Sequence, residues 1–411
     1  MLAFQERDCT CNSLCITMAT RMWVTMATRR SPSNGLLLLP RGALQPSNTG
    51  SLKTKASKYT AAPFTTNSYI FDNKRFFPFT TSHGFHGNRC HHVTMATDKD
   101  PYHSRLSNVF EIRSRPDPVV WGDDDKTGPF SRQELEFYRT NGYIKVEGLF
   151  DVDEIQTYCE KFTTGKDELE EDIKSNEEFI TTDNYTCVTE PGSTKIRSIY
   201  SPHKFLPAAN QLCRDRRLLG RVRQILNSDV YMHHTRLNFK QQFKGTGFYW
   251  HSDFETWHTE DGMPRPRCLT CMVLMTRNLP QNGALMVIPG SHRHYISCAG
   301  PTPDNHWISS LQDRYIGIPN QEALSQMVKE GGIHYCTGEA GSVFFFDCNL
   351  LHGSQANFSP WDRMNFFLVY NSVDNKLVPP FGPPKPRPET LGTRDPAWVQ
   401  PITPLEKPTE E

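Results

Sequence analysis

The sequence lacks an apolar run long enough to cross a membrane. A transmembrane helix needs about 20 consecutive, mainly apolar residues, and stretches such as the four leucines at 36–39 are far shorter. We therefore expect a soluble protein without a membrane partner.

The sequence also lacks the dense, regular cysteine spacing of a small disulfide-stabilised protein. Its 12 cysteines are scattered over 411 residues, which favours free thiols in a reducing compartment. The C-x-x-C pair, Cys268 and Cys271, could serve zinc binding or redox chemistry as well as plain burial. Because it lies in an apolar run typical of a strand, where residues three apart point to opposite faces, we expect burial.

An excess of one charge is missing too, since 45 Lys and Arg residues balance 45 Asp and Glu residues. A protein that binds nucleic acid usually carries a basic surface, so nucleic acid is not an expected partner. The balance hides a division, because residues 1–97 hold 11 basic and 3 acidic residues. The remainder of the chain is therefore acidic.

Residues 1–97 show no sustained helical or strand period, which predicts a disordered extension. A basic, Ser-rich composition is typical of a transit peptide, and we expect an organelle location, mitochondrion or plastid. The motif Thr-Met-Ala-Thr occurs three times in this segment, and its third copy contains Met95. Translation from Met95 would give a cytoplasmic form. The histidines and cysteine of 83–92 lack paired ligand spacing, and we expect no metal site there.

From residue 98 the pattern is that of a folded domain, which we expect to end at 377, before a Pro-rich tail at 378–411. Ser131 and Glu134 form a capping-box signature for a first helix, and Asp151 suits the start of a second. Further helices are expected at 211–226 and 320–329.

Short runs of β-forming residues, separated by Gly, Pro and Asn, predominate after residue 230. The expected strands are 231–243, 268–276, 284–288, 342–346 and 364–369. Short strands at this density favour a sandwich or jelly roll. The sequence therefore predicts a mainly β fold with flanking helices.

Three residues form a candidate metal site. His251 and Asp253 lie two apart, so on an extended strand both side chains emerge on the same face. The pair alone is weak, since a chain with 15 histidines produces such a spacing by chance. His352 strengthens it, because it follows a strand-like run that ends at Asp347. Two imidazoles and one carboxylate on one face of an octahedral metal leave three positions open, which suits Fe(II) better than hydrolytic zinc.

A cosubstrate site follows the third ligand. Arg363 presents a planar guanidinium, which can hold the distal carboxylate of 2-oxoglutarate through paired hydrogen bonds. Ser354 lies two residues after His352 and can add a hydroxyl donor. The carboxylate ligand Asp253 favours hydroxylation over halogenation, because iron halogenases lack it to make room for chloride.

Residues 248–264 read Phe-Tyr-Trp-His-Ser-Asp-Phe-Glu-Thr-Trp-His-Thr-Glu-Asp-Gly-Met-Pro. This stretch resembles the signature of the ectoine hydroxylases within the phytanoyl-CoA dioxygenase superfamily, and the similarity extends from 130 to 373. The resemblance implies a double-stranded β-helix (jelly-roll) core. It also implies hydroxylation of ectoine to 5-hydroxyectoine, an osmoprotective compatible solute, with Fe(II) as cofactor and 2-oxoglutarate and O₂ as cosubstrates.

The family's motif carries over residue by residue. It implies the iron ligands already proposed, His251, Asp253 and His352. The residues implied to hold 2-oxoglutarate are Arg236, Asn238, Phe248, Ser354 and Arg363. Trp257 matches a tryptophan that lines the substrate pocket, where an indole face suits the flat, partly cationic ring of ectoine. His234 stands where the family usually has a substrate-binding glutamine, and its imidazole can donate to the ectoine carboxylate.

Two functional alternatives remain open. The enzyme could act on another small zwitterion, such as a proline-like amino acid, or the chain could be a non-catalytic jelly-roll module that retains a metal site. The oligomeric state is open as well, with a homodimer as one possibility.

Overall fold

The computed structural model describes residues 100–122, 128–173, 179–308, 317–383 and 385–405. Within them the strands form three antiparallel sheets, of eight, four and two strands. In spatial order, the large sheet consists of β2 (Tyr143–Val146), β12 (Val343–Asp347), β8 (Cys268–Leu274), β14 (Arg363–Ser372), β6 (Val230–Lys240), β5 (Ile196–Tyr200), β4 (Thr186–Thr189) and β3 (Phe179–Thr181). The small sheet consists of β11 (His334–Tyr335), β9 (Leu285–Val287), β13 (His352–Ser354) and β7 (Phe248–His251). The pair is β1 (Ile112–Ser114) and β10 (His294–Ile296).

Strict alternation along the central strands divides the core into two layers. In β12, Val343 and Phe345 pack into the larger hydrophobic cluster, whereas Phe344 and Phe346 pack into a second cluster with Leu285 of the small sheet. Successive side chains of a strand point to opposite faces, so one face of the large sheet meets the helices and the other meets the small sheet. This arrangement confirms the predicted mainly β jelly roll with flanking helices.

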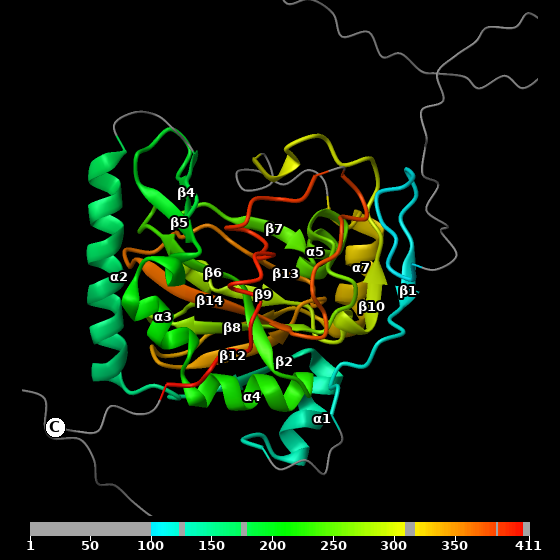
Figure 1. Ribbon diagram of the computed structural model, residues 1–411, viewed down its shortest axis with the longest axis horizontal. Helices are drawn as coiled ribbons and strands as arrows, with labels where there is room; N and C mark the ends of the chain where they lie inside the picture. The colour runs from blue at the N-terminus through cyan, green and yellow to red at the C-terminus, as the bar shows by residue number, and fades with distance from the viewer. Residues whose placement is uncertain (1–99, 123–127, 174–178, 309–316, 384, 406–411) are drawn as a thin grey trace, which may run out of the picture. The chain divides into compact units, whose positions relative to one another are not determined.

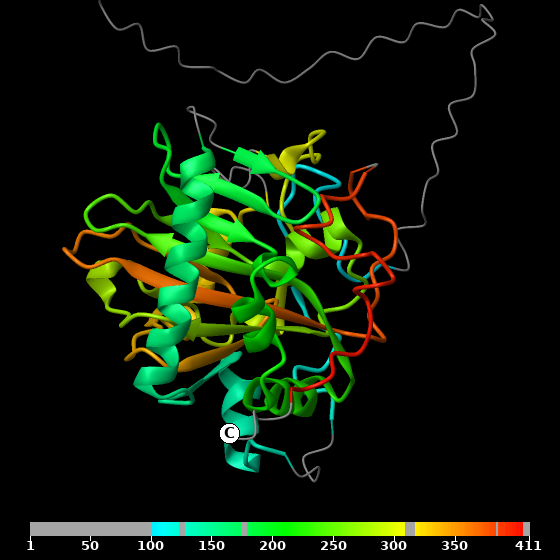
Figure 2. The same cartoon turned by 60° about the vertical axis from the view of Figure 1, so that its left-hand side comes forward.

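The helices of the outer layer are α1 (Arg132–Asn141), α2 (Val152–Asp172), α3 (Pro207–Cys213) and α4 (Arg216–Leu226). Of these, α1, α2 and α4 begin at a residue whose side chain caps the helix, whereas α3 begins at Pro207 without a side-chain cap. The predicted capping box of Ser131 and Glu134 is formed, and the Asp151 side chain accepts a hydrogen bond from the Glu154 amide. Figure 2 shows α2 lying across the large sheet, and Figure 1 shows α1 and α4 together at its lower edge.

The single helix predicted at 211–226 is wrong. The chain forms two helices there, α3 and α4, because Asp215 accepts a hydrogen bond from the Arg217 amide and so starts a new helix. Side-chain capping competes with helix continuation at such a residue.

Each predicted strand is present, with ends that shift by a few residues. The helix predicted at 320–329 is also present as α7 (Gln321–Gly331), which Asn320 caps at its start. Cys268 and Cys271 are buried in β8 and belong to different hydrophobic clusters, which confirms that they are buried on opposite faces.

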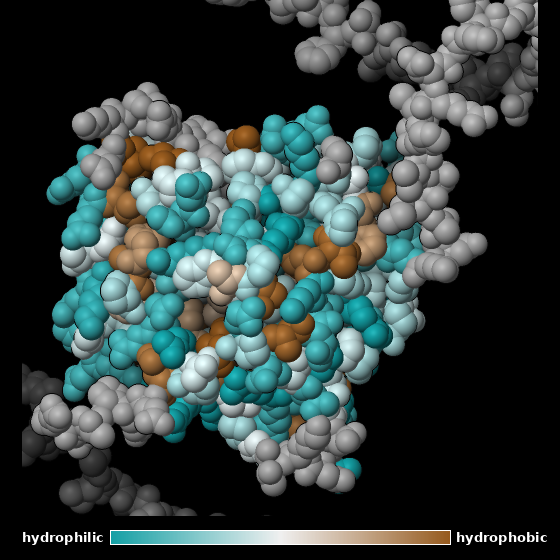
Figure 3. Space-filling model, in the orientation of Figure 1, coloured by the Kyte–Doolittle hydropathy of each residue, from teal (hydrophilic) through white to brown (hydrophobic). Residues whose placement is uncertain are grey.

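The surface seen in Figure 3 is mainly hydrophilic, and its apolar residues form small groups between polar ones. Among the described residues, no helix combines the length and apolar character needed to cross a membrane. The predictions for 1–97, including Met95 and the histidines of 83–92, lie outside the described residues.

The C-terminal segment packs onto the domain. In Figure 1 the red chain runs from the side of α5 (Asp253–Asp261) across the front of the view towards α4. Leu391 and Thr393 are buried, and the Ile402 amide donates to the Val230 carbonyl at 2.9 Å.

Candidate active site

The three candidate ligands converge from three elements. His251 ends β7, Asp253 begins α5, and His352 begins β13, where it pairs directly with His251 across the small sheet. Asp253 Oδ1 lies 3.5 Å from His251 Nε2, and Asp253 Oδ2 lies 3.7 Å from His352 Nε2. One donor atom from each residue falls within 4.8 Å of the others. The predicted grouping is therefore present.

The expected path between His251 and Asp253 was wrong. The two residues do not share an extended strand, because β7 ends at His251 and Asp253 opens a helix. Ser252 between them is extended, with φ −103° and ψ 133°, and forms the N-cap of α5, so the carboxylate stands at the helix start beside the strand end. A carboxylate at a helix N-terminus is also stabilised by the helix dipole.

Backbone contacts orient both imidazoles towards the group. His251 Nδ1 lies 2.7 Å from the Tyr249 carbonyl oxygen, and His352 Nδ1 lies 2.9 Å from that of Leu350. A carbonyl oxygen can only accept, so each Nδ1 carries the proton and each Nε2 presents its lone pair. A second ring contact of this kind is the usual support of a metal-binding histidine. Two neutral imidazoles and a carboxylate fit a divalent iron ion that needs open positions.

The ligands face a cavity between the large sheet and the small sheet. It contains about 540 Å³ of space between atoms, including its mouth. Side chains of β6, β8 and β14 line one wall, and those of β7, β9 and β13 line the other. The lining residues predicted from sequence are His234, Arg236, Asn238, Phe248, His251, Asp253, His352, Ser354 and Arg363, and Thr270, Leu285, Gly353, Phe367 and Val369 join them.

One end of this cavity is strongly cationic. Arg363 is 2% exposed and donates to the Asn238 side-chain oxygen, while Asn238 Nδ2 donates to Ser198 Oγ at 3.1 Å. Asn238 thus orients the guanidinium. The Arg236 guanidinium lies 5.3 Å from the Tyr200 ring and 5.4 Å from the Phe248 ring, distances at which a cation and an aromatic face attract.

Burial and the Arg236 charge lower the pKa of Arg363 to about 9. The charge of Arg363 is therefore poorly compensated in the ligand-free protein. A buried cation without a full counter-charge is a binding site for an anion.

Sequence reasoning missed Lys240, whose amine lies near Arg363 and Arg236 and becomes a third cation only when it is protonated. Its Nζ donates to Ser354 Oγ at 3.0 Å and also to the Gln355 carbonyl, and the residue is 3% exposed. Burial, followed by the charges of Arg363 and Arg236, lowers the pKa of Lys240 to about 6. The available signal was its spacing on β6, two residues after Asn238, which places it on the face that carries Arg236 and Asn238.

At the opposite end, His234 and Trp257 are neighbours. Their rings are 5.5 Å apart in an edge-to-face arrangement. His234 lines the cavity, whereas Trp257 is 3% exposed and packs with Phe254 and Tyr102 behind it, outside the lining set. Burial, with the charges of His233 and Arg387, holds the pKa of His234 well below its usual range. The imidazole therefore enters the site neutral.

Sequence relatives agree with the predicted resemblance. An ectoine dioxygenase from Bordetella bronchiseptica is 45% identical over 296 residues, which cover 72% of this chain and 93% of that protein. An ectoine dioxygenase from Sphingopyxis alaskensis is also 45% identical, over 72% of this chain and 94% of its own length.

These comparisons contradict the predicted organelle location. The relatives are bacterial proteins, and bacteria have no mitochondrion or plastid to which a transit peptide could be addressed. The prediction of an organellar transit peptide in residues 1–97 finds no support in them and is wrong. Composition misled here, because many basic, Ser-rich segments that are not targeting signals share it.

Solved structures of EctD are similar to this chain in fold as well as in sequence. EctD from S. alaskensis with 2-oxoglutarate and 5-hydroxyectoine matches with a TM-score of 0.64 and 41% identity, over 75% of this chain and 99% of that one. The same protein with bound Fe matches with a TM-score of 0.64 and 40% identity, over the same shares. Residues 138–365 match the family model described as Phytanoyl-CoA dioxygenase (PhyH). The chain belongs to the phytanoyl-CoA dioxygenase family, as an iron- and 2-oxoglutarate-dependent dioxygenase.

Proposed function

We propose that this enzyme hydroxylates ectoine to 5-hydroxyectoine while 2-oxoglutarate is decarboxylated to succinate and CO₂, with one oxygen atom of O₂ entering the new hydroxyl group and the other entering succinate. The observation that carries the proposal is the pairing of a three-ligand group with a buried cationic pocket in one cavity. The 45% identity to ectoine dioxygenases and the likeness to EctD with 2-oxoglutarate and 5-hydroxyectoine support ectoine as the substrate. We assign catalysis to residues 98–377.

In this proposal His251, Asp253 and His352 hold the iron. Bound Fe(II), together with 2-oxoglutarate and O₂, supplies the oxidising chemistry that turns a C–H bond of the substrate into C–OH. The protein fixes the imidazoles through the Tyr249 and Leu350 carbonyls, so the ligand geometry exists before the metal arrives. Preorganisation of this kind lowers the cost of assembling reactants.

Arg363, Ser354 and Lys240 hold the distal carboxylate of 2-oxoglutarate. Arg363 offers paired donors, and Lys240 lies on Ser354 Oγ, so the hydroxyl is held where it can reach the anion. Arg236 keeps Phe248 in place through ring contact and adds positive charge. The anion in turn compensates the cations that the fold buries.

Neutral His234 faces the substrate, and Trp257 supports it from behind. His234 can donate one ring hydrogen to the ectoine carboxylate. His234 is also the reason for considering a second substrate, because a histidine in place of the usual glutamine places the hydrogen-bond donor at a different distance from the backbone. A different small zwitterion, such as a proline-like amino acid, is the alternative substrate.

The test is direct. Purified protein with Fe(II), 2-oxoglutarate and ectoine should form 5-hydroxyectoine and succinate in equal amounts. His251→Ala should reduce both products to background, whereas His334→Ala, at an exposed position outside the cavity, should not. Succinate formation with a proline-like substrate but not with ectoine would select the alternative, and no succinate with any substrate would favour a non-catalytic module. Light scattering of the same sample would test the homodimer.

A further inference from the structure

The segment from Val378 to Arg394 contacts the C-terminal half of α5 at several points. The Val378 amide donates to the Gly262 carbonyl and the Gly382 amide to the Thr259 carbonyl, both at 2.9 Å. The Phe381 ring stacks on His258 with 4.1 Å between centroids. At Gly262, where φ is +75°, a Cβ atom would lie 1.9 Å from the Val378 carbonyl oxygen. Segment and helix end are thus closely fitted to each other.

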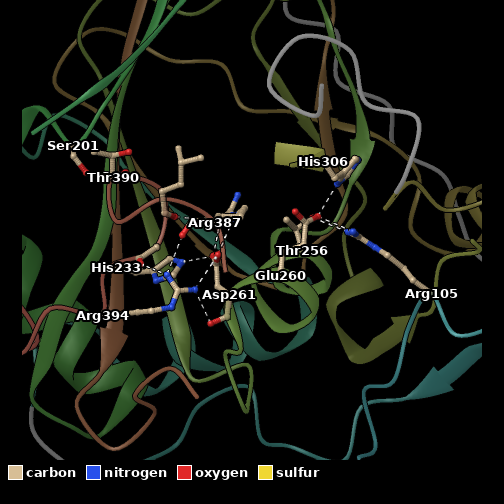
Figure 4. A network of polar contacts seen from close by, with 12 residues as sticks. Arg105, Ser201, His233, Thr256, Glu260, Asp261, His306, Arg387, Thr390 and Arg394 are labelled. Carbon is tan, nitrogen blue, oxygen red and sulfur yellow. Dashed lines mark hydrogen bonds and ion pairs between the residues drawn. The ribbon is translucent and has the colours of Figure 1, made fainter. Parts of the chain in front are cut away.

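Buried charge anchors this contact at Asp261, the last residue of α5. Arg387 grips the Asp261 carboxylate with two donors, at 2.8 Å and 2.5 Å, and Arg394 donates to the Asp261 carbonyl at 2.9 Å. Asp261 is fully buried. Figure 4 shows both arginines and His233 converging on this carboxylate. A bidentate pair in a buried setting has a defined geometry as well as a favourable energy.

The same segment is hydrogen-bonded to β6 at His233, the residue that precedes the cavity-lining His234. The Thr393 amide donates to the His233 carbonyl at 3.0 Å, and His233 Nε2 lies 3.3 Å from Asp261 Oδ2. The pairing of β6 with β14 skips His233, since Val369 faces His234 and Tyr370 faces Met232. Such a bulge re-aims neighbouring side chains, so His234 depends on how His233 is held.

The geometry of α5 links this anchor to the chemistry. Asp253, Trp257 and Asp261 are spaced by four residues, so they share one face of the helix. The iron ligand stands at one end of that face and the anchor at the other. Trp257, between them, contacts the rings of both His233 and His234.

We propose that residues 378–383 and 385–394 form a positioning strap, in which Arg387 and Arg394 hold Asp261 and thereby fix Trp257 and His234 at the substrate end of the cavity. Arg387 and Arg394 are positioning residues, since neither lines the cavity. Besides burial and the His233 charge, the charge of Arg387 also lowers the pKa of His234. The inference rests on the proposed function for its substrate, but the anchor itself does not depend on which substrate binds. At the 2-oxoglutarate end, the hydrogen bonds of Arg363 and Lys240 involve no strap residue. The strap approaches that end through Leu391, which packs with Tyr200 beside Arg236.

The kinetic test separates the two ends of the cavity. Arg387→Met should raise the KM for ectoine about tenfold, because small misplacements of positioning groups have effects of this size or larger. It should leave the KM for 2-oxoglutarate within about twofold and increase the succinate formed per 5-hydroxyectoine. Arg387→Lys, which keeps the charge but not the paired donors, should fall between. Lys385→Met removes an exposed cation of the same segment and should match the wild type.

A second variant guards against a folding defect. Arg387→Met leaves Asp261 buried without its bidentate partner, which is destabilising, whereas the double variant Asp261→Asn/Arg387→Met removes both charges of that pair. The double variant should recover stability but keep the raised KM for ectoine. If it restores the wild-type KM, or if the single variant changes both KM values by the same factor, the strap only stabilises the fold and the proposal is wrong.

Amide hydrogen exchange without substrate gives an independent measure. In Arg387→Met, exchange should speed up in 254–262 and at the start of β6, and stay unchanged in β13. Equal exchange in wild type and variant would overturn the strap whatever the substrate is. If exchange is faster in Arg387→Met than in the wild type, as expected, but the wild type does not hydroxylate ectoine, only the proposed function fails.

Discussion

Arg363 should reduce the stability of the ligand-free protein while it binds the cosubstrate. Its pKa falls from an ordinary value above 12 to about 9 because of burial and the nearby Arg236. At 1.36 kcal/mol for each pKa unit, the charged form costs about 4 kcal/mol in the folded state. A cation with a lowered pKa carries this cost in full below pH 9, and the cost falls gradually as the pH rises from 9 towards the ordinary pKa above 12.

Arg363→Met should therefore stabilise the ligand-free protein at pH 7.5. The gain is smaller than the full cost, because the variant loses the hydrogen bond to Asn238, about 1–2 kcal/mol, and fills the site less well. We expect a net increase of about 1–2 kcal/mol in the free energy of unfolding. Cosubstrate binding should weaken by about 10²-fold or more, since two charge-assisted hydrogen bonds are lost.

Urea unfolding under anaerobic conditions with Fe(II), with and without 2-oxoglutarate, measures both effects. At 2-oxoglutarate concentrations about 100-fold above Kd, the wild type should gain about 2.7 kcal/mol and the variant almost nothing. Arg293→Met, at an exposed site, is the matched control and should resemble the wild type. A ligand-free variant clearly less stable than the wild type, or one that still gains stability from 2-oxoglutarate, would refute the reasoning.

Three further predictions concern titration and specificity. The KM for 2-oxoglutarate should rise between pH 6 and pH 8, because the pKa of Lys240 is about 6 before the anion binds and the protonated amine favours the anion. Lys240→Met should lose most of this pH dependence of the KM, and an unchanged pH dependence in the variant would contradict the prediction. The free energy of unfolding should fall as the pH drops below the ordinary pKa of histidine, since burial lowers the pKa of His203 to about 3 and of His292 to about 4. The unfolded chain then takes up protons that the folded chain does not. Greater urea resistance at pH 5 than at pH 7 would argue against this prediction. His234→Gln should preserve ectoine hydroxylation and change the KM for ectoine by less than His234→Ala, which removes the donor altogether, as steady-state assays would show. Equal effects would mean that His234 makes no hydrogen bond to the substrate.

The periodic parts of this protein could be predicted from the sequence. The run of β-forming residues at 342–346 indicated a strand, and the structure places Phe344 and Phe345 of that strand in different clusters. Ser131 with Glu134 marked a helix start because the capping contacts are local. His352 and Ser354 lie on one short strand, so their spacing could be read without knowing the rest of the fold.

Other features were decided by the packing of distant segments. His251 and Asp253 meet because a strand ends and a helix begins between them, a change that the two-residue spacing does not reveal. Lys240 belongs to the site because the fold brings Ser354 of β13 within hydrogen-bond distance of its amine, a contact between residues far apart in sequence.

The contact between Asp261 and Arg387 spans 126 residues of sequence. No local period encodes such a pair, since either residue alone reads as an ordinary surface charge. The sequence determined which faces are apolar, where helices start and which donor types are available. Only the tertiary structure decided which charges are removed from water together, because that depends on the register of the sheets, the bulge at His233 and the path of the C-terminal segment.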